Sequence, residues 1–279
     1  MDKNKIKILI IIVIAILIYV GIVFLADRSA TKEERTIESQ DVLIINKDYM
    51  YIKTAGVWSF ATPEEYNKII PRKDFQIFSN GEYVGTYRIK FMNYYFYYID
   101  KNGNEKQLKY PVWFYSSPVN TIESLAFEYE NMDESDDKLA KSYLDSDVFY
   151  PSSPYEFTNH KKIVFDYDND GVKEKMLFVS TGYSNEFSDS KKVFGMVLYV
   201  DGSDVQVVFK NIADRGTPES EFYEYFLMSV YKFSNQDKNT IVLGRNIPMG
   251  GLEFCPTIFE FNGNQLEEKV TCKEGNLWN

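Results

Sequence analysis

This chain has very little histidine and cysteine, and the shortage excludes several kinds of site. Among 279 residues there is one histidine, His160, and there are two cysteines, Cys255 and Cys272. A zinc site built on several histidines is excluded, and a Ser-His-Asp triad would have to use His160. That residue lies in the polar stretch TNHKK, which favours a place on the surface.

Positive charge is also scarce. The chain has 31 lysines and arginines against 41 aspartates and glutamates, a formal net charge of −10. A nucleic-acid partner would require a basic face, so we expect no nucleic acid. The sequence contains neither a glycine-rich phosphate loop nor a Gly-x-Ser-x-Gly nucleophile elbow, the two commonest short signs of an active site.

One long stretch without charge lies near the beginning, from Ile8 to Ala26. Its length of about 19 residues nearly spans a hydrocarbon core as a helix, and predicts a transmembrane segment. A cleaved signal peptide has a shorter apolar run, and cleavage after Ala26 would put Phe24 where a small residue is needed. A lipid-modified cysteine is excluded because no cysteine lies nearby.

Lysine and arginine flank this stretch on both sides and bear on its orientation. Three lysines precede it and three basic residues follow it: Lys3, Lys5 and Lys7, then Arg28, Lys32 and Arg35. The lysine and arginine content of the two flanks is nearly balanced, and we favour a cytoplasmic N-terminus. The expected arrangement is a single-pass protein of the cell membrane, with residues 1–7 in the cytoplasm, 8–26 in the membrane and the C-terminal part outside the cytoplasm.

The remaining chain predicts a mainly β ectodomain with a few short helices, because aromatic and β-branched residues gather in short runs between turn signals. Residues 27–40 form a polar juxtamembrane linker, and 41–117 a β-rich module. Within that module, a capping-box pattern at Thr62 predicts a short helix to about Ile70. Residues 118–151 form an acidic, solvated and partly helical connector, with a helix from about Asp136 to Leu144.

Residues 152–279 contain a repeated pattern. KIVFDYDNDGVKEKMLFVS is followed by FGMVLYVDGSDVQVVF, and LMSVYKFSNQDKNTIVLG by CPTIFEFNGNQLEEKV. Asp201-Gly202 and Asn262-Gly263 hold the same place and are hairpin signals. Each unit therefore predicts a four-stranded antiparallel, blade-like meander. Two blades do not close a propeller ring, so the choice between a propeller and a sandwich stays open.

The first loop of this repeat has the oxygen spacing of a calcium loop. Asp166, Asp168 and Asp170 hold places one, three and five, and Gly171 makes the turn at six. An EF-hand needs glutamate at place twelve, but Leu177 is there. Because both flanks read as strands, the pattern predicts a strand–loop–strand site and not an EF-hand.

The stretch FDYDNDGVKEKMLFV resembles the calcium loop of FG-GAP and VCBS-type repeats, the blades of integrin-alpha-like β-propellers. The resemblance covers about the last 125 residues. It implies one structural Ca²⁺ held by five residues: Asp166, Asp168, Asp170, Val172 and Glu174. A Phe-Gly-Gly-Ala-Pro-like element is missing. The second unit has Lys232, Ser234, Gln236 and Thr240 at ligand places. A lysine at place one repels a cation, so we expect no second ion.

The cysteines flank the last predicted hairpin. If Gly263 and Asn264 form its tip, Asn262 faces Gln265, and continuing outward Cys255 faces Cys272 at disulfide distance. If the tip lies one residue earlier, the two are offset by two places. A cross-strand disulfide and two free, buried thiols therefore both stay open. A disulfide would fit a location outside the cytoplasm.

The aromatic run MNYYFYYID leaves a further choice. Tyr95 and Tyr97 would share one face of a strand and could stack on a sugar, but a sheet buried on both sides explains the run equally well.

Taken together, these features predict a membrane-anchored, extracytoplasmic binding or adhesion protein, with a cell-surface protein or a carbohydrate as partner. Two alternatives stay open. The first is a carbohydrate-active hydrolase of the cell envelope, since two carboxylates suffice for that chemistry. The second is a component of an envelope assembly or a sensor.

Overall fold

The computed structural model describes residues 39–45, 49–79, 82–92, 95–108, 112–118, 120–144, 159–180, 192–214, 224–246 and 254–271. Nearly all of its elements are strands in antiparallel sheets, which confirms a mainly β fold. No helix in these ranges is long and apolar enough to cross a membrane. The apolar stretch 8–26, for which we predicted a membrane span, lies outside the described residues.

The first module forms one sheet, here called the N-terminal sheet, in the strand order β3-β2-β1-β8-β4-β5-β6-β7. Its strands are β1 (Asp41–Ile45), β2 (Tyr49–Thr54), β3 (Val57–Phe60), β4 (Asp74–Ser79), β5 (Glu82–Met92), β6 (Tyr95–Ile99), β7 (Glu105–Gln107) and β8 (Val112–Ser116). The predicted helix is present as α2 (Pro63–Ile69), followed by the short 3₁₀ helix η1 (Ile70–Arg72). As the sequence indicates, Thr62 and Glu65 close a capping box at its start.

The C-terminal part forms two five-stranded sheets. The outer sheet contains β10 (Glu130–Asn131), β11 (Asn159–Phe165), β12 (Glu174–Ser180), β13 (Lys192–Asp201) and β14 (Asp204–Asp214). The central sheet contains β9 (Ile122–Leu125), β15 (Glu224–Phe233), β16 (Thr240–Asn246), β17 (Phe254–Asn262) and β18 (Gln265–Thr271). Each repeat unit is a four-stranded meander, and the connector adds one edge strand to each sheet.

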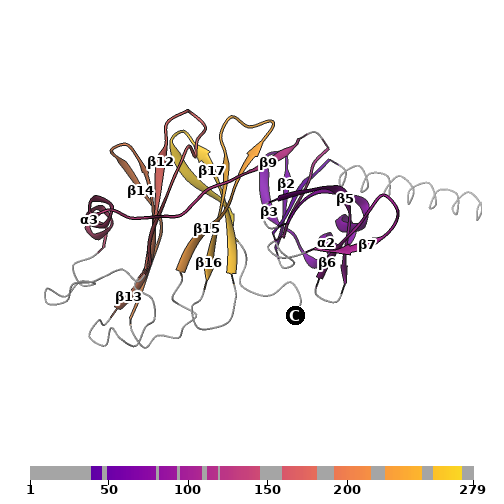
Figure 1. Cartoon of the computed structure of the whole chain (residues 1–279), viewed down its shortest axis with the longest axis horizontal. Coiled ribbons are helices and arrows are strands. Elements are labelled where there is room, and N and C mark those ends of the chain that lie inside the picture. The colour runs from indigo at the N-terminus through magenta and orange to yellow at the C-terminus, as the bar shows by residue number, and fades with distance from the viewer. Residues whose placement is uncertain are drawn as a thin grey trace, which may run out of the picture.

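The three sheets lie side by side along the long axis, with the central sheet buried on both faces (Figure 1). Phe178 and Tyr199 of the outer sheet share a core with Phe259 of the central sheet. On the opposite face of the central sheet, Tyr231 packs in a core with Trp58 of the N-terminal sheet. This burial explains why strands of the second unit are rich in large apolar residues on alternate faces.

Both ends of the stack are covered. Helix α3 (Glu134–Ser142) packs Ala140 against Phe194 and Leu198 on the outer face of the outer sheet. At the other end, the N-terminal sheet curves around α2, and Phe96 and Phe114 fill the space between. The described residues therefore form a capped stack in which the two repeat units face each other.

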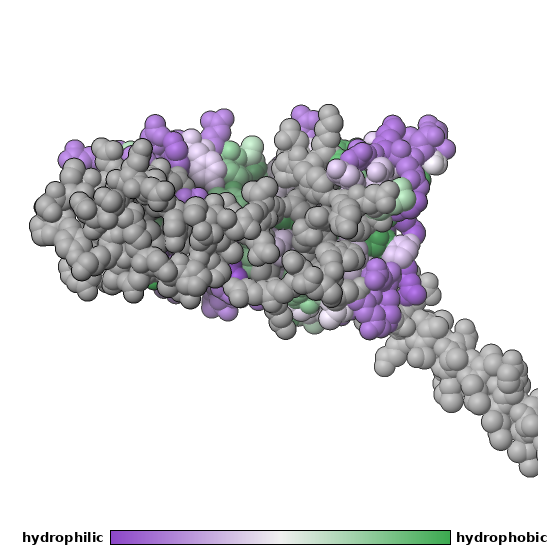
Figure 2. Space-filling view, turned by 90° about the horizontal axis from the view of Figure 1, so that it is seen from below, coloured by the Kyte–Doolittle hydropathy of each residue, from purple (hydrophilic) through white to green (hydrophobic). Residues whose placement is uncertain are grey.

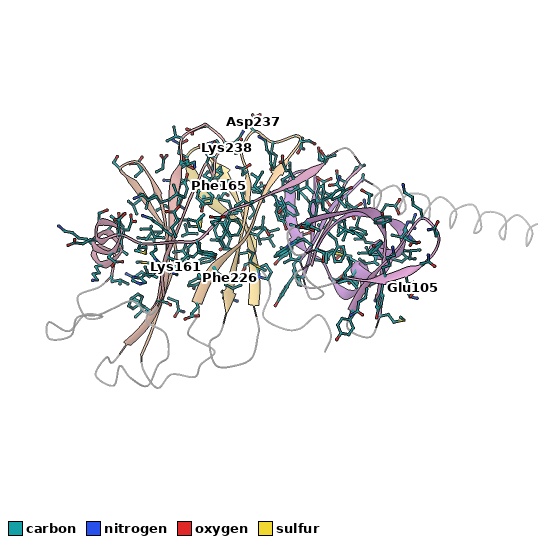
Figure 3. The ribbon with its side chains drawn as sticks, in the orientation of Figure 1. Glu105, Lys161, Phe165, Phe226, Asp237 and Lys238 are labelled. Carbon is teal, nitrogen blue, oxygen red and sulfur yellow. The ribbon has the colours of Figure 1, made fainter. Side chains whose placement is uncertain are left out.

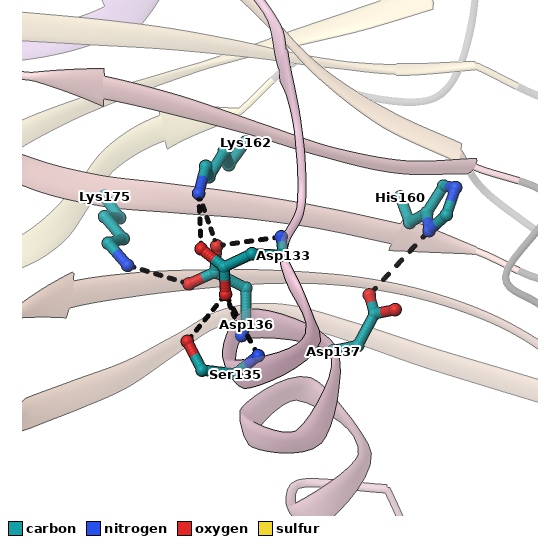
Figure 4. A network of polar contacts seen from close by, with 7 residues as sticks. All are labelled: Asp133, Ser135, Asp136, Asp137, His160, Lys162 and Lys175. Atoms are coloured by element: carbon teal, nitrogen blue, oxygen red, sulfur yellow. Dashed lines mark hydrogen bonds and ion pairs between the residues drawn. The ribbon is translucent and has the colours of Figure 1, made fainter.

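Within the acidic connector, Asp136 of helix α3 departs from the predicted solvated run, whereas Glu130, Asp133 and Glu134 are exposed. Helix α3 begins at Glu134, earlier than the predicted Asp136, because Asp133 caps it and pairs with Asp136 in a capping box. Asp136 is buried, and its carboxylate accepts hydrogen bonds from Lys162 at 2.7 Å and Lys175 at 2.8 Å (Figure 4). The acidic run thus supplies a buried counter-charge for two lysines of the outer sheet.

Of the two tips that the sequence left open, the last hairpin has the one at Gly263 and Asn264, since Asn262 faces Gln265. A bulge between Ile258 and Phe259 then shifts the pairing by one residue, so that Thr257 faces Thr271. Cys255, which lies beyond this bulge on β17, is disulfide-bonded. The chain has one other cysteine, Cys272, which lies outside the described residues.

Candidate metal centre

The predicted calcium loop connects β11 and β12 and brings four carboxylates together. Phe165 and Glu174 are paired across the two strands, so the loop closes directly at the end of the hairpin. One oxygen each of Asp166, Asp168, Asp170 and Glu174 lies within 4.8 Å of the others. Four of the five predicted ligands thus meet at one point.

The loop owes its shape to hydrogen bonds from its own backbone. The two carboxylate oxygens of Asp166 accept from the amides of Asp170 and Gly171, both at 3.0 Å. Gly171 has a φ of +92°, a conformation that residues with a Cβ rarely adopt. Val172, the fifth predicted ligand, has an exposed side chain, and its amide donates to Asp170 at 2.8 Å.

Electrostatics make the cluster unfavourable without a cation. Glu174 is buried, and this burial raises its pKa to about 7. The hydrogen bond from the Tyr167 amide opposes the shift, whereas the charges of Asp168, Asp166 and Asp170 add to it. Carboxylates that repel one another at this distance favour uptake of a positive charge.

Two buried oxygens at the loop have no hydrogen-bond partner among the described residues. They are Oδ1 of Asp168 and Oδ1 of Asn239. The amide nitrogen of Asn239 donates to the Asp166 carbonyl at 3.0 Å, which fixes its side chain against the loop. Leaving a buried acceptor unpaired is costly, and a hard cation would satisfy it. The residues therefore fit such an ion. The all-oxygen set suits Ca²⁺, Mg²⁺ or Mn²⁺ and does not single out calcium.

A lysine from the second unit contacts the acidic loop. Lys238, on the loop between β15 and β16, lies 2.9 Å from Oδ2 of Asp168 and donates to the Gly263 carbonyl at 2.6 Å. Figure 3 shows it beside Asp237 at the top of the stack, where the loops of the outer and central sheets meet. Lys232, at the first place of the degenerate loop, instead contacts the Asn169 side chain at 2.9 Å.

Lys238 and Asn239 are residues of this site that the sequence interpretation missed. The place of Lys238 in the second loop corresponds to Val172 in the first, because each lies six positions after the first ligand place. Aligning the two loops shows this lysine. Only the face-to-face packing of the two units shows that it reaches the first loop.

The other candidate residues give less support to a functional site. His160 is partly exposed, and its Nδ1 lies 3.7 Å from Asp137 (Figure 4). On β6, Phe96 is fully buried, whereas Tyr95 is 44% exposed, so the aromatic run has one buried face and one accessible face. The interpretation of a sheet buried on both sides is wrong for Tyr95. On the face shown in Figure 2, coloured hydrophobic surface occurs in small separate areas among hydrophilic residues.

A cavity of about 400 Å³ lies where the N-terminal sheet meets β9. Its lining consists of Gln76, Phe78, Tyr83, Ile122, Glu123 and Ser124. Glu123 is the one carboxylate of this lining. A glycosidase needs two carboxylates across its substrate, so this cavity gives no support to a hydrolase.

Comparison of the chain with protein-family models, with curated proteins and with solved structures found no match. The resemblance of the loop to FG-GAP and VCBS-type repeats therefore stays a prediction.

Proposed function

We propose that this chain is a membrane-anchored, extracytoplasmic binding protein in which the β11–β12 loop holds one structural calcium ion. The observation that carries the proposal is the convergence of four carboxylates within 4.8 Å, one of which has a buried oxygen without a partner among the described residues. Such a set needs positive charge, and calcium is abundant outside cells. Val172 would complete the set through its carbonyl.

The role of the ion is structural because the site joins two sheets. Asp168 contacts Lys238, and the Asp166 carbonyl contacts Asn239, so the loop of the outer sheet is bonded to the loop of the central sheet. An ion bound there would neutralise the carboxylates and hold the two ends of the β11–β12 loop together. Calcium enclosed by protein ligands leaves few positions for a reacting water.

Other features support the proposed location and class. The apolar stretch from Ile8 to Ala26 supports a membrane anchor, and the disulfide at Cys255 supports an oxidising compartment. The cavity beside β9 has a single carboxylate in its lining, whereas a glycosidase needs two. The partner would be a cell-surface protein or a carbohydrate. A part in an envelope assembly or a sensor would use the same anchor and site.

Calcium should stabilise the full chain in detergent. With a dissociation constant on the order of 10⁻⁴–10⁻³ M, about 10 mM Ca²⁺ should raise the melting temperature by about 3–10 °C. The Asp168→Ala variant should lose this rise, because Asp168 offers the buried, unpartnered oxygen. Differential scanning calorimetry with and without calcium measures both.

Asp204→Ala serves as the matched control, since Asp204 is an exposed aspartate on β14 of the same sheet. It should keep the full calcium response. A wild-type chain whose melting temperature ignores calcium would refute the metal site, and equal loss in both variants would show that the effect is not local.

Oxidation and membrane attachment should occur in the same molecules. If the chain is isolated from membranes without reductant, with thiols blocked at lysis, peptide mapping should find Cys255 joined to Cys272. This result is expected because Cys255 is disulfide-bonded and disulfides persist outside the cytoplasm. Recovery of the chain in the soluble fraction, or with two blocked thiols, would contradict the proposed location.

A further inference from the structure

We infer that Lys238 is a built-in cation of the acidic loop, which neutralises Asp168 from the neighbouring sheet and competes with a divalent ion for that carboxylate. The neutralising role stands on the geometry alone. The competition rests on the proposed calcium site. The degenerate second repeat would thus regulate the affinity of the intact first one.

Three contacts hold the ammonium group in place. It lies 2.9 Å from Oδ2 of Asp168 and 2.6 Å from the carbonyl oxygen of Gly263, at the tip of the β17–β18 hairpin. It also lies 5.3 Å from the centre of the Phe261 ring, a cation–π distance. The Asp168 side chain is only 8% exposed, so this pair is shielded on the carboxylate side. The Lys238 side chain is 34% exposed and can be displaced toward solvent.

The same carboxylate has a second oxygen that the lysine does not use. Oδ1 of Asp168 is buried without a partner in the described part of the chain, and so is Oδ1 of Asn239. One ammonium group facing four carboxylates leaves the cluster negative. The cluster therefore keeps enough negative charge and enough oxygen ligands to bind a divalent ion beside the ammonium group of Lys238.

The consequence for affinity follows from charge repulsion. A divalent ion at Oδ1 would share the Asp168 carboxylate with the ammonium at Oδ2. Two positive charges on one carboxylate repel at close range, so the lysine weakens ion binding and the ion weakens the lysine contact. This repulsion should decrease as added salt screens it, because Lys238 is partly exposed.

Calcium titration of three variants of the full chain in detergent tests the inference. Lys238→Met removes the charge and keeps a side chain of similar length. It should lower the dissociation constant for calcium about tenfold at low ionic strength, and by a smaller factor in high salt. Lys238→Arg keeps the charge and should stay within about twofold of the wild type. Lys232→Met removes a lysine that contacts the neutral side chain of Asn169, and should also change the constant by less than about twofold. Isothermal titration calorimetry gives each value.

A second measurement needs no calcium. In EDTA, Lys238→Met should lower the melting temperature, and this loss should shrink by roughly half or more when Asp168→Asn is already present, because the pair is then broken. Lys238→Gln provides the same cycle if the methionine variant does not fold.

The two measurements separate the possible failures. A wild type that binds calcium while Lys238→Met binds equally or more weakly overturns the competition and leaves the calcium site standing. A wild type that binds no calcium refutes the calcium site, while coupling between Lys238 and Asp168 in EDTA still supports the lysine as the cation of the loop. Absence of that coupling overturns the inference in every case.

Discussion

Replacing Glu260 by leucine should lower the free energy of unfolding by about 3 kcal/mol. Oε1 of Glu260 on β17 accepts hydrogen bonds from Lys53 on β2, from the Trp58 indole at 2.8 Å and from Gln236 at 3.2 Å. The pair with Lys53 joins the N-terminal sheet to the central sheet. Removing the carboxylate leaves Lys53, whose side chain is 12% exposed, without the counter-charge of Glu260. Urea unfolding followed by tryptophan fluorescence measures the loss.

Glu267 provides the matched control, because it lies directly opposite Glu260 on β18 and is half exposed in its pair with Lys269. Glu267→Leu should change stability by less than about 0.5 kcal/mol. Combining Glu260→Leu with Lys53→Met should restore most of the loss, since replacing both partners leaves no unpaired charge. Equal effects of the two glutamate variants would contradict a special role of the partly buried pair.

The pair also predicts a dependence on pH. Burial by itself would raise the pKa of Glu260, but the hydrogen bonds from Lys53 and Trp58 and the charge of Lys53 outweigh it and lower the pKa. A carboxylate with a lowered pKa in the folded state stabilises the protein above its unfolded pKa. This contribution is lost as the pH falls from the usual carboxylate range through the folded pKa. Acid should therefore destabilise the wild type more than the double variant.

Replacing Asp136 by alanine should cost about 3 kcal/mol as well. Its side chain is 3% exposed, and its two oxygens bind Lys162 and Lys175 separately. The change leaves the nearly buried Lys162 with Asp133 as its remaining partner in the described network (Figure 4). It removes the counter-charge of Lys175. It also opens the capping box of α3. Calorimetry gives the stability, and hydrogen exchange should show α3 amides opening first.

The neighbouring residue separates this effect from a general loss of negative charge. Asp137→Ala removes a carboxylate whose Oδ1 lies 3.7 Å from Nδ1 of His160, and should cost less than about 0.5 kcal/mol. Asp136→Asn should fall between the two, because it keeps a capping oxygen and loses the charge. Similar costs for Asp136→Ala and Asp137→Ala would show that the buried network does not stabilise α3.

Local patterns in the sequence predicted those features that depend on neighbours along the chain. The capping box at Thr62 and Glu65, the hairpin at Asn262-Gly263 and the convergence of the loop carboxylates all depend on spacings of a few residues. Such spacings have nearly the same geometry in any fold. The bulge at Ile258 lacks such a signal, and it changed the pairing beyond it by one residue.

The acidic connector shows the limit of this approach. A run of acidic residues is usually solvated, and nothing local distinguishes Asp136 from its neighbours. Its burial is decided by Lys162 and Lys175, which lie on β11 and β12, after a long separation along the chain. A buried charge is tolerated only where its partner arrives from elsewhere in the fold.

By itself, the sequence determined a mainly β fold, two meanders and one oxygen-rich loop, because alternation, turn residues and ligand spacing act over short distances. Only the tertiary structure decided that the meanders face each other in a capped stack, since face-to-face packing depends on which apolar surfaces meet. It also placed Lys238 on Asp168, across 70 positions of the chain. Charge contacts of that kind are set by how whole sheets pack, and no local pattern encodes them.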